Sequence, residues 1–395
     1  MNIAKRLLLS CISALLFIAS ARADVQVSVL TCSPGDEAYA LYGHTALRYR
    51  NMSRNLDVVF NYGCFDFSTP NFGWRFVLGE TDYMVGCTDF RNFLPEYAER
   101  GSGVVEQVID LTDDEAQLLF EALLTNIRPQ NRVYRYRYLD NNCTTKVRDR
   151  LLEALAESGE VIYADVAQPT ETYRAALNAL AGAHPWYTFG INLLLGADVD
   201  TAPSLEGAQF LPLDYMKALD GMSLIQRDGT ERKVVRGTNI LLAEVEKPVS
   251  PNNFTPFNVS LLLLLGTFIV MLCELRKRRT FWGFDILLMT VQGLAGSLLL
   301  FMALCSEHPA VDTNWLIVLF NPLALVLLPL YVWCIRGHRP VRIAWVQVVL
   351  VALFVFTAVL GLQVYPTPIY FCAAALLARS LFHIYKDRIC DLNIV

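Results

Sequence analysis

The sequence has few charged residues and a small net charge, and both shortages limit what the protein can be. Asp, Glu, Lys and Arg make up 18% of its 395 residues, and the formal net charge is −5. Soluble globular chains have about a quarter of charged residues, so part of this chain differs from a soluble domain. A nucleic-acid partner would favour a concentrated basic surface, and the small net charge argues against one. The sequence also lacks internal repeats and low-complexity tracts.

Apolar residues are in excess: they account for 54% of the sequence and are unevenly distributed. Residues 24–250 mix Asp, Arg, Tyr and Phe as a globular domain does, whereas residues 257–390 are largely Leu, Val, Ile, Phe and Ala. A segment with three prolines, 247–256, separates the two regions. We therefore predict an exported domain at 24–246, a linker at 247–256 and a membrane region at 257–395.

The amino terminus has the three-part layout of a secretory signal peptide. Lys5 and Arg6 precede the apolar run Leu7–Ile18, and a small-x-small site follows at Ala21–Ala23. This pattern predicts a signal peptide at 1–23, cleaved after Ala23. An uncleaved anchor is the alternative, but the apolar run is short for a membrane span. In either case residue 24 onward lies outside the inner membrane.

The membrane region contains five apolar runs that could cross a bilayer as helices. Each is close to the ~20 residues that a transmembrane helix needs. The predicted spans are Phe257–Leu275, Gly283–Leu304, Trp315–Ile335, Ala344–Leu362 and Ile369–Tyr385. We therefore predict an α-helical bundle of about five spans.

Basic residues alternate from one connection to the next and indicate the orientation of the bundle. They follow the first, third and fifth spans, at Arg276–Arg279, Arg336–Arg342 and Lys386–Arg388. The other two connections, Cys305–Asn314 and Gln363–Pro368, contain no Lys or Arg. By the positive-inside rule, the basic connections and the carboxy terminus are cytoplasmic. The amino-terminal domain of this multi-pass inner-membrane protein is then periplasmic, in agreement with the signal peptide.

The exported domain has strand and helix patterns of an α+β fold. Thr45–Arg50 and Asp57–Tyr62 are β-rich runs joined by the polar turn Asn51–Asn55, which predicts a hairpin. Thr112–Glu115 has the form of a capping box and predicts a helix start. A second helical pattern begins at Cys143, after three polar residues.

Two residues of the exported domain suggest nucleophilic catalysis. His44 is placed at a strand start, and Cys143 at a helix start, where unpaired backbone N–H groups and the helix dipole lower the pKa of a thiol. A thiolate beside an imidazole is the working pair for acyl transfer, and amides at the helix start can hold the oxyanion. No other His precedes His184, which leaves few choices of base.

Structural roles for the same residues are the alternative. A single Cys at a helix start is often a small buried residue or half of a disulfide. The mature exported region has four cysteines, Cys32, Cys64, Cys87 and Cys143, and in an oxidising compartment two disulfides would use them all. The chain would then be a non-catalytic, membrane-anchored sensor or scaffold.

The order of these residues resembles a known enzyme group. His44 begins one strand, Asn61 lies on the partner strand, and Asn142-Cys143 begins a later helix. This layout resembles the permuted papain-fold, NlpC-like lipid acyltransferases of the lecithin:retinol acyltransferase type. The resemblance implies a permuted papain-like exported domain in which Asn61 orients His44, with Asp66 as the substitute.

Longer motifs resemble a particular family, the Lnb-type bacterial lipoprotein N-acyltransferases. They are Leu30–Asp36, Leu41–Tyr49, Val59–Phe72, Asp140–Asp149 and the outer loop Ser306–Pro309. The resemblance covers nearly the whole chain. It implies transfer of an acyl chain from a membrane phospholipid to the α-amine of a diacylglyceryl-cysteine lipoprotein, through a cysteine thioester and with no cofactor or metal. The expected partners are the phospholipid acyl donor, diacylated lipoproteins and membrane lipid.

Four further residues are weaker site predictions. Tyr42 would add an oxyanion donor beside the Cys143 backbone, and Arg48 and Arg148 would bind the phosphate unless they are surface charges. His308 belongs to the outer loop, which is either a solvated turn or a set of polar groups facing a lipid headgroup. The rival enzyme prediction is a periplasmic NlpC-like cysteine peptidase or amidase acting on cell-wall peptides, which would use the same Cys–His pair without needing five spans.

Overall fold

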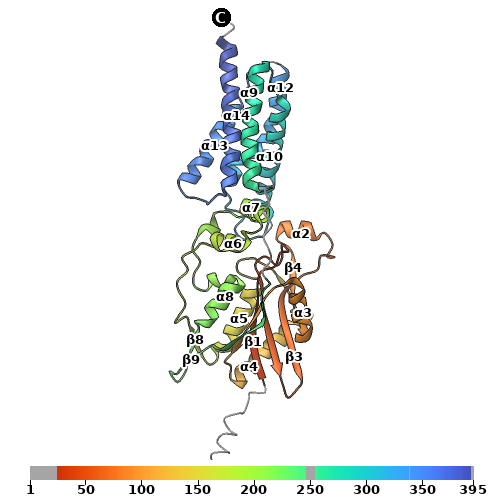
Figure 1. Ribbon diagram of the computed structural model, residues 1–395, viewed down its shortest axis with the longest axis vertical. Helices are drawn as coiled ribbons and strands as arrows, with labels where there is room; N and C mark the ends of the chain where they lie inside the picture. Colours follow the sequence, from red (N-terminus) through yellow and green to blue (C-terminus); the bar gives the residue numbers. More distant parts are fainter. Residues whose placement is uncertain (1–24, 246–253, 338, 393–395) are drawn as a thin grey trace, which may run out of the picture.

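The computed structural model describes residues 25–245, 254–337 and 339–392. The predicted signal peptide, 1–23, and most of the predicted linker, 247–256, lie outside the described residues. An α+β domain occupies one end of the molecule and a bundle of apolar helices the other (Figure 1). This arrangement confirms the predicted fold class.

Seven strands of the exported domain form one antiparallel sheet in the order β10-β5-β1-β2-β3-β4-β6. Its strands are β1 (Val25–Cys32), β2 (His44–Asn51), β3 (Leu56–Cys64), β4 (Asp82–Asp89), β5 (Val104–Ile109), β6 (Val133–Arg135) and β10 (Val235–Leu242). The predicted hairpin is present as β2 and β3, and Asn55 adopts a positive φ of 49° in its turn. Asn tolerates this backbone region better than most residues.

Helices cover both faces of the sheet, which is why β1 and β2 are buried on both sides. One face packs against α4 (Asp113–Asn126), α5 (Cys143–Ala156) and α8 (Pro212–Asp220). The other face packs against α3 (Phe90–Arg100). Thr112 caps α4 through the capping box that the sequence predicts.

The rest of the exported domain consists of short elements whose order the sequence pattern did not reveal. They are α2 (Phe72–Leu78), α6 (Tyr173–Ala181), α7 (Pro185–Leu194), η1 (Ala197–Asp200), η2 (Gly207–Phe210), and a small sheet of β7 (Gly159–Ile162), β8 (Ser223–Gln226) and β9 (Glu231–Lys233). In Figure 1, α2, α6 and α7 lie between the large sheet and the near end of the bundle.

The bundle consists of five apolar segments, as predicted, but they differ in length. Its helices are α9 (Pro256–Lys277), α10 (Trp282–Cys305), α11 (Leu316–Leu319), α12 (Leu323–Arg336), α13 (Ala344–Val359) and α14 (Thr367–Leu392). Four segments are long and apolar enough to cross a membrane: α9, α10, α14, and α11 and α12 counted as one. The fifth segment, α13, is shorter.

The third predicted span, Trp315–Ile335, is not one continuous helix. It breaks at residues 320–322, between α11 and α12, because Pro322 has no N–H with which to continue the helical hydrogen bonds. Gln292 Nε2 donates to the carbonyl oxygen of Leu319 at 2.7 Å and satisfies a group freed by the break. A Cβ at Gly296 would lie 2.1 Å from the Phe320 carbonyl oxygen, so glycine permits this close approach of α10.

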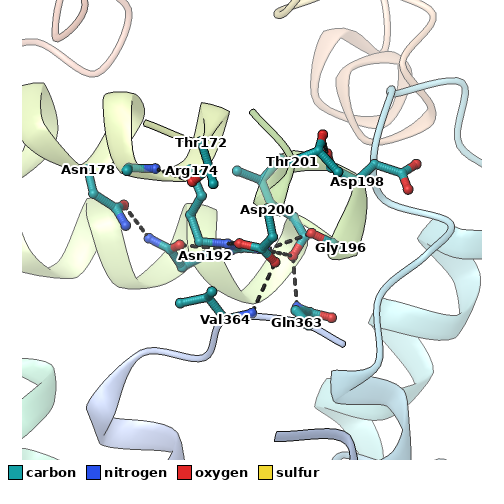
Figure 2. Close-up of polar contacts among 12 residues, drawn as sticks. Thr172, Arg174, Asn178, Asn192, Gly196, Asp198, Asp200, Thr201, Gln363 and Val364 are labelled. Carbon is teal, nitrogen blue, oxygen red and sulfur yellow. Dashed lines mark hydrogen bonds and ion pairs between the residues drawn. The ribbon is translucent and has the colours of Figure 1, made fainter. Parts of the chain in front are cut away.

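A buried polar cluster joins the exported domain to the bundle (Figure 2). Arg174 of α6 is 3% exposed and forms an ion pair with Asp200 of η1, with 2.6 Å between Nε and Oδ1. Asp200 Oδ2 also accepts from the Val364 backbone N–H at 3.0 Å, and Gln363 Nε2 donates to the Leu195 carbonyl oxygen at 3.1 Å. Gln363 and Val364 lie in the loop between α13 and α14. Because such hydrogen bonds are directional, the cluster fixes how the two parts meet.

Candidate active site

Cys143 is the first residue of α5, and its position is set by the preceding residue. The Asn142 side-chain oxygen accepts from the amides of Thr144 and Thr145 at 2.8 and 3.0 Å. The Asn142 amide nitrogen donates to the carbonyl oxygens of Tyr138 and Phe210 at 2.8 and 2.9 Å. Asn142 therefore caps the helix and anchors its start to two other segments, which holds the thiol in place.

His44 is the first residue of β2 and is oriented by the neighbouring strand. Asn61 lies opposite Ala46 in the β2–β3 register, diagonally across from His44 on the same face. His44 Nε2 and Asn61 Oδ1 are 3.2 Å apart. The ring also stacks beside Tyr97 of α3, with centroids 6.4 Å apart. The strand register and α3 together fix the imidazole.

The thiol of Cys143 and the imidazole of His44 interact, and each changes the pKa of the other. Burial alone would raise the pKa of Cys143, but the charge of His44 and hydrogen bonds from His44 and the Thr45 backbone lower this pKa below its ordinary 9.0. Burial would lower the pKa of His44, but the Cys143 charge and its hydrogen bonds raise it above 6.5. The pair thus favours thiolate and imidazolium.

Three residues beside the pair were not singled out from the sequence. Thr45 and Thr144 directly follow the two predicted residues, and their hydroxyl oxygens are 3.0 Å apart, which joins β2 to α5. Gly63 has a positive φ of 89°, and a Cβ there would lie 3.5 Å from Cys143 Cβ. Adjacency to His44 and Cys143 was the only signal for the threonines, and no sequence signal placed Gly63 beside the thiol.

The described cysteines, including the four predicted to allow two disulfides, are all free thiols. Cys143 interacts with His44 and is not part of a disulfide. The free thiol argues against a disulfide role for Cys143. Among the residues that the structure describes, no group of three or more His, Cys, Asp or Glu side chains could hold a metal ion.

Asn61, and not Asp66, contacts His44. Both carboxylate oxygens of Asp66 accept from Ser68, at 2.8 Å from its amide and 2.7 Å from its hydroxyl, in an exposed turn. Asp66 is thus held within its own turn. Of the two predicted orienters, only Asn61 has a contact with the imidazole.

We predict that Asn61→Ala slows the acyl transfer that the sequence resemblance implies by about tenfold, because one hydrogen bond of about 1–1.5 kcal/mol that orients the imidazole is lost. Asp66→Ala, the matched control, should leave the rate unchanged. The measurement is the initial rate of acyl transfer by purified protein at equal folded concentration. Equal losses in both variants would contradict the role given to Asn61.

The structure corrects the predictions for two arginines. Arg48 is buried, not a surface charge, and its guanidinium contacts Asp57 and Glu106 at 2.7 and 2.9 Å. Arg148 is also buried, and it pairs with Asp149 at 2.8 Å and Glu206 at 3.3 Å. Both cations are neutralised by carboxylates of the exported domain, so neither is an open phosphate site.

Tyr42 lies in an aromatic cluster near the site. Its ring packs against Tyr138 and Tyr187, with centroids 5.2 and 6.2 Å apart. Burial raises the pKa of its hydroxyl. Among the described residues its recorded contacts are with this cluster and none is with Cys143, so its role as an oxyanion donor stays a prediction.

The outer loop around His308 contacts the exported domain, which the sequence did not predict, and its role toward a lipid headgroup stays a prediction. His308 Nε2 lies 2.6 Å from the Phe76 carbonyl oxygen, and Ser306 Oγ donates to the Val77 carbonyl oxygen at 2.8 Å. Glu307 forms an ion pair of 2.8 Å with Arg135. The loop therefore fastens α2 to the outer end of the bundle.

The fold and the site together define a class: a membrane protein whose amino-terminal α+β domain carries a Cys–His pair and is docked on a helical bundle. Two family models match the chain. The Lnb N-terminal periplasmic domain matches residues 18–179, and the Lnb transmembrane domain matches residues 248–388. The chain therefore belongs to the Lnb family, with its amino-terminal domain periplasmic. No curated protein and no solved structure matches it.

Proposed function

We propose that the protein is a lipoprotein N-acyltransferase that works through a thioester on Cys143. The observation that carries the proposal is the pairing of Cys143 with His44 at the amino terminus of a helix, where the interaction with His44 lowers the pKa of the thiol. A low-pKa thiolate with a positioned imidazole is suited to acyl transfer. Membership of the Lnb family supports the choice of lipoproteins as acceptors.

In the first half-reaction the Cys143 thiolate attacks the ester carbonyl carbon of a phospholipid. The ester C–O bond breaks, His44 gives its proton to the glyceryl oxygen, and a lysophospholipid leaves. In the second half-reaction the α-amine of a diacylglyceryl-cysteine attacks the thioester. The C–S bond breaks, the amine proton passes to His44, and the thiolate is restored. Each tetrahedral intermediate carries an oxyanion that the Cys143 amide, at the start of α5, is placed to stabilise.

The position of the pair supports a lipid substrate. Strand β3 ends at Cys64 and leads into α2, which lies at the near end of the bundle in Figure 1. The ring of Trp74 in α2 packs on Phe301 of α10, with centroids 5.3 Å apart. His44, at the start of β2, lies at this same end of the sheet, because β2 and β3 are antiparallel. The pair therefore lies at the membrane side of the exported domain.

Aromatic side chains extend from α2 toward the thiol. Phe65 packs on Phe72 and on Tyr83, and Tyr83 stacks on Tyr136 with centroids 4.2 Å apart. Tyr136 and Cys143 both lie next to Gly63, 3.7 and 3.5 Å from where its Cβ would be. An apolar surface of this kind suits an acyl chain and has no evident use for a cell-wall peptide, so we favour the acyltransferase over the NlpC-like peptidase.

Lipoprotein mass spectrometry in cells with and without the gene tests the proposed function. We expect lipoproteins of the deletion strain to lack one acyl chain, the one on the α-amine, and the wild-type gene to restore it. A Cys143→Ala gene should fail to restore it. An unchanged acyl count in the deletion strain would reject the acyltransferase function.

A further inference from the structure

The bundle contains a buried polar cluster at the end that lies away from the exported domain. Glu274, Asp285, Arg379 and His383 are between 1% and 6% exposed and come from α9, α10 and α14. Asp285 lies in the first turn of α10, whose last residue, Cys305, precedes the outer loop that contacts α2. Ionisable residues inside a membrane are costly and mark functional sites.

The charges within this cluster balance each other. Arg379 Nη2 donates to Glu274 Oε1 at 2.6 Å and to Asp285 Oδ2 at 2.7 Å, and Arg379 Nε also donates to Asp285. Tyr331 donates to Asp285 Oδ2 at 2.5 Å, and Lys386 Nζ lies 3.3 Å from Glu274 Oε2. Each carboxylate oxygen has a partner. The cluster therefore has no unused acceptor on either carboxylate.

Three buried side-chain nitrogens around one cavity have no hydrogen-bond partner among the described residues. One of them, His383 Nε2, lies 3.2 Å from Asp285 Oδ2. The other two are hydrogen-bond donors, Arg379 Nη1 and Gln347 Nε2. Both residues line a cavity of about 70 Å³, which is larger than the ~10–15 Å³ that one water needs on this measure. A buried donor without an acceptor costs about 1–3 kcal/mol. A molecule with oxygen acceptors in this cavity would satisfy both donors.

The remaining walls of the cavity are mostly aliphatic, with Leu288, Leu327 and Leu350 among them. Two further lining residues, Leu323 and Val346, are 45% and 38% exposed on the outside of the bundle. The cavity therefore borders the surface that faces lipid. A site with donors inside and aliphatic walls that meet the bilayer suits an amphipathic molecule better than water alone.

The two donors lie at different depths in the bundle. Arg379 contacts Asp285, whereas Gln347 accepts a hydrogen bond of 2.9 Å from Gln292. Asp285 and Gln292 are seven residues apart on α10, a rise of about 10 Å. A phospholipid has oxygen acceptors at two depths, on its phosphate and on its ester carbonyls.

We propose that this cavity binds a phospholipid of the leaflet away from the exported domain. Its phosphate oxygen accepts from Arg379 Nη1, its ester carbonyl accepts from Gln347 Nε2, and its acyl chain lies along the leucines. Arginine is well suited to phosphate, and pockets between transmembrane helices on the cytoplasmic side bind lipid headgroups. The site is separate from Cys143 and does not depend on the proposed acyl transfer.

Native mass spectrometry of the full chain in detergent, with phosphatidylethanolamine added, tests the proposal. Ala344→Leu fills the cavity and Gln347→Leu removes one donor, and neither residue belongs to the ion cluster. The matched control is Val355→Leu, on the lipid-facing side of α13 and outside the cavity. Thermal unfolding in the same detergent shows that each variant is folded.

We expect the wild type and Val355→Leu to retain one phospholipid and each cavity variant to lose about tenfold in affinity, the equivalent of one hydrogen bond of about 1.4 kcal/mol. Diacylglycerol lacks the phosphate, so we expect it to bind the wild type at least as weakly as the phospholipid binds the cavity variants. Binding to folded Ala344→Leu as tight as to the wild type would overturn the proposal. Equal binding of diacylglycerol, or no bound lipid in the wild type, would overturn it as well.

Discussion

Replacing Cys143 with alanine should reduce acyl transfer by about 10³-fold or more, because the nucleophile that forms the thioester is removed. Cys143→Ser should be almost as inactive, since a serine hydroxyl is not ionised near neutral pH. The readout is transfer of a labelled acyl chain from phospholipid to a diacylated lipopeptide by purified protein in detergent.

Cys87→Ala is the matched control for this substitution. Cys87 is a free thiol on β4, and burial and Asp89 raise its pKa, so it is a poor nucleophile. The control should keep the wild-type rate. A Cys143→Ala protein that transfers at more than about a tenth of the wild-type rate, well above the residual activity expected of such a variant, would contradict the mechanism.

Removing the imidazole should change the pH at which Cys143 reacts. In the wild type the lowered thiol pKa keeps thiolate present below pH 9.0, so alkylation by iodoacetamide should persist toward neutral pH. In His44→Gln the burial of the thiol is no longer offset by the charge of His44, so the pKa of Cys143 should rise. We expect alkylation of this variant at neutral pH to fall about tenfold for each unit by which its pKa rises, and to recover in alkali.

The pKa shifts of Cys143 and His44 set the direction of this pH dependence. The thiolate is lost as the pH falls through the lowered pKa of Cys143, and the imidazolium is lost as the pH rises through the raised pKa of His44. Both shifts therefore widen the pH range in which the thiolate and the imidazolium are present together. His184→Gln, at the start of α7, is the control and should keep the wild-type profile. An unchanged profile in His44→Gln would show that the imidazole does not tune the thiol.

The parts of the fold that the sequence predicted correctly depend on local patterns. The β2–β3 hairpin is a pattern of neighbouring residues, and so are the capping box at Thr112 and the five apolar segments. Asn142 was seen as part of a helix start for the same reason. His44 and Cys143 were linked because few residue types can form such a nucleophilic pair, and the structure brings them into contact.

The contacts that the sequence did not reveal are between residues distant in the sequence. Arg48 pairs with Glu106, which is 58 residues away, and His308 meets Phe76, which is 232 residues away. No local pattern specifies such contacts. The break between α11 and α12 was missed because hydropathy counts apolar residues and ignores the missing N–H of Pro322. The sequence pattern named Asn61 as the orienter and Asp66 as its substitute, and the strand register places Asn61 beside His44.

Intact-protein mass spectrometry of the purified enzyme with phospholipid and no acceptor tests the central claim most directly. We predict a mass gain of one acyl chain, located on Cys143, removed by hydroxylamine as a thioester is, and lost when a diacylated lipopeptide is added. Cys143→Ala should show no such gain. An acyl group on another residue, or acyl transfer with no acylated enzyme even in rapid-quench samples, would contradict the account.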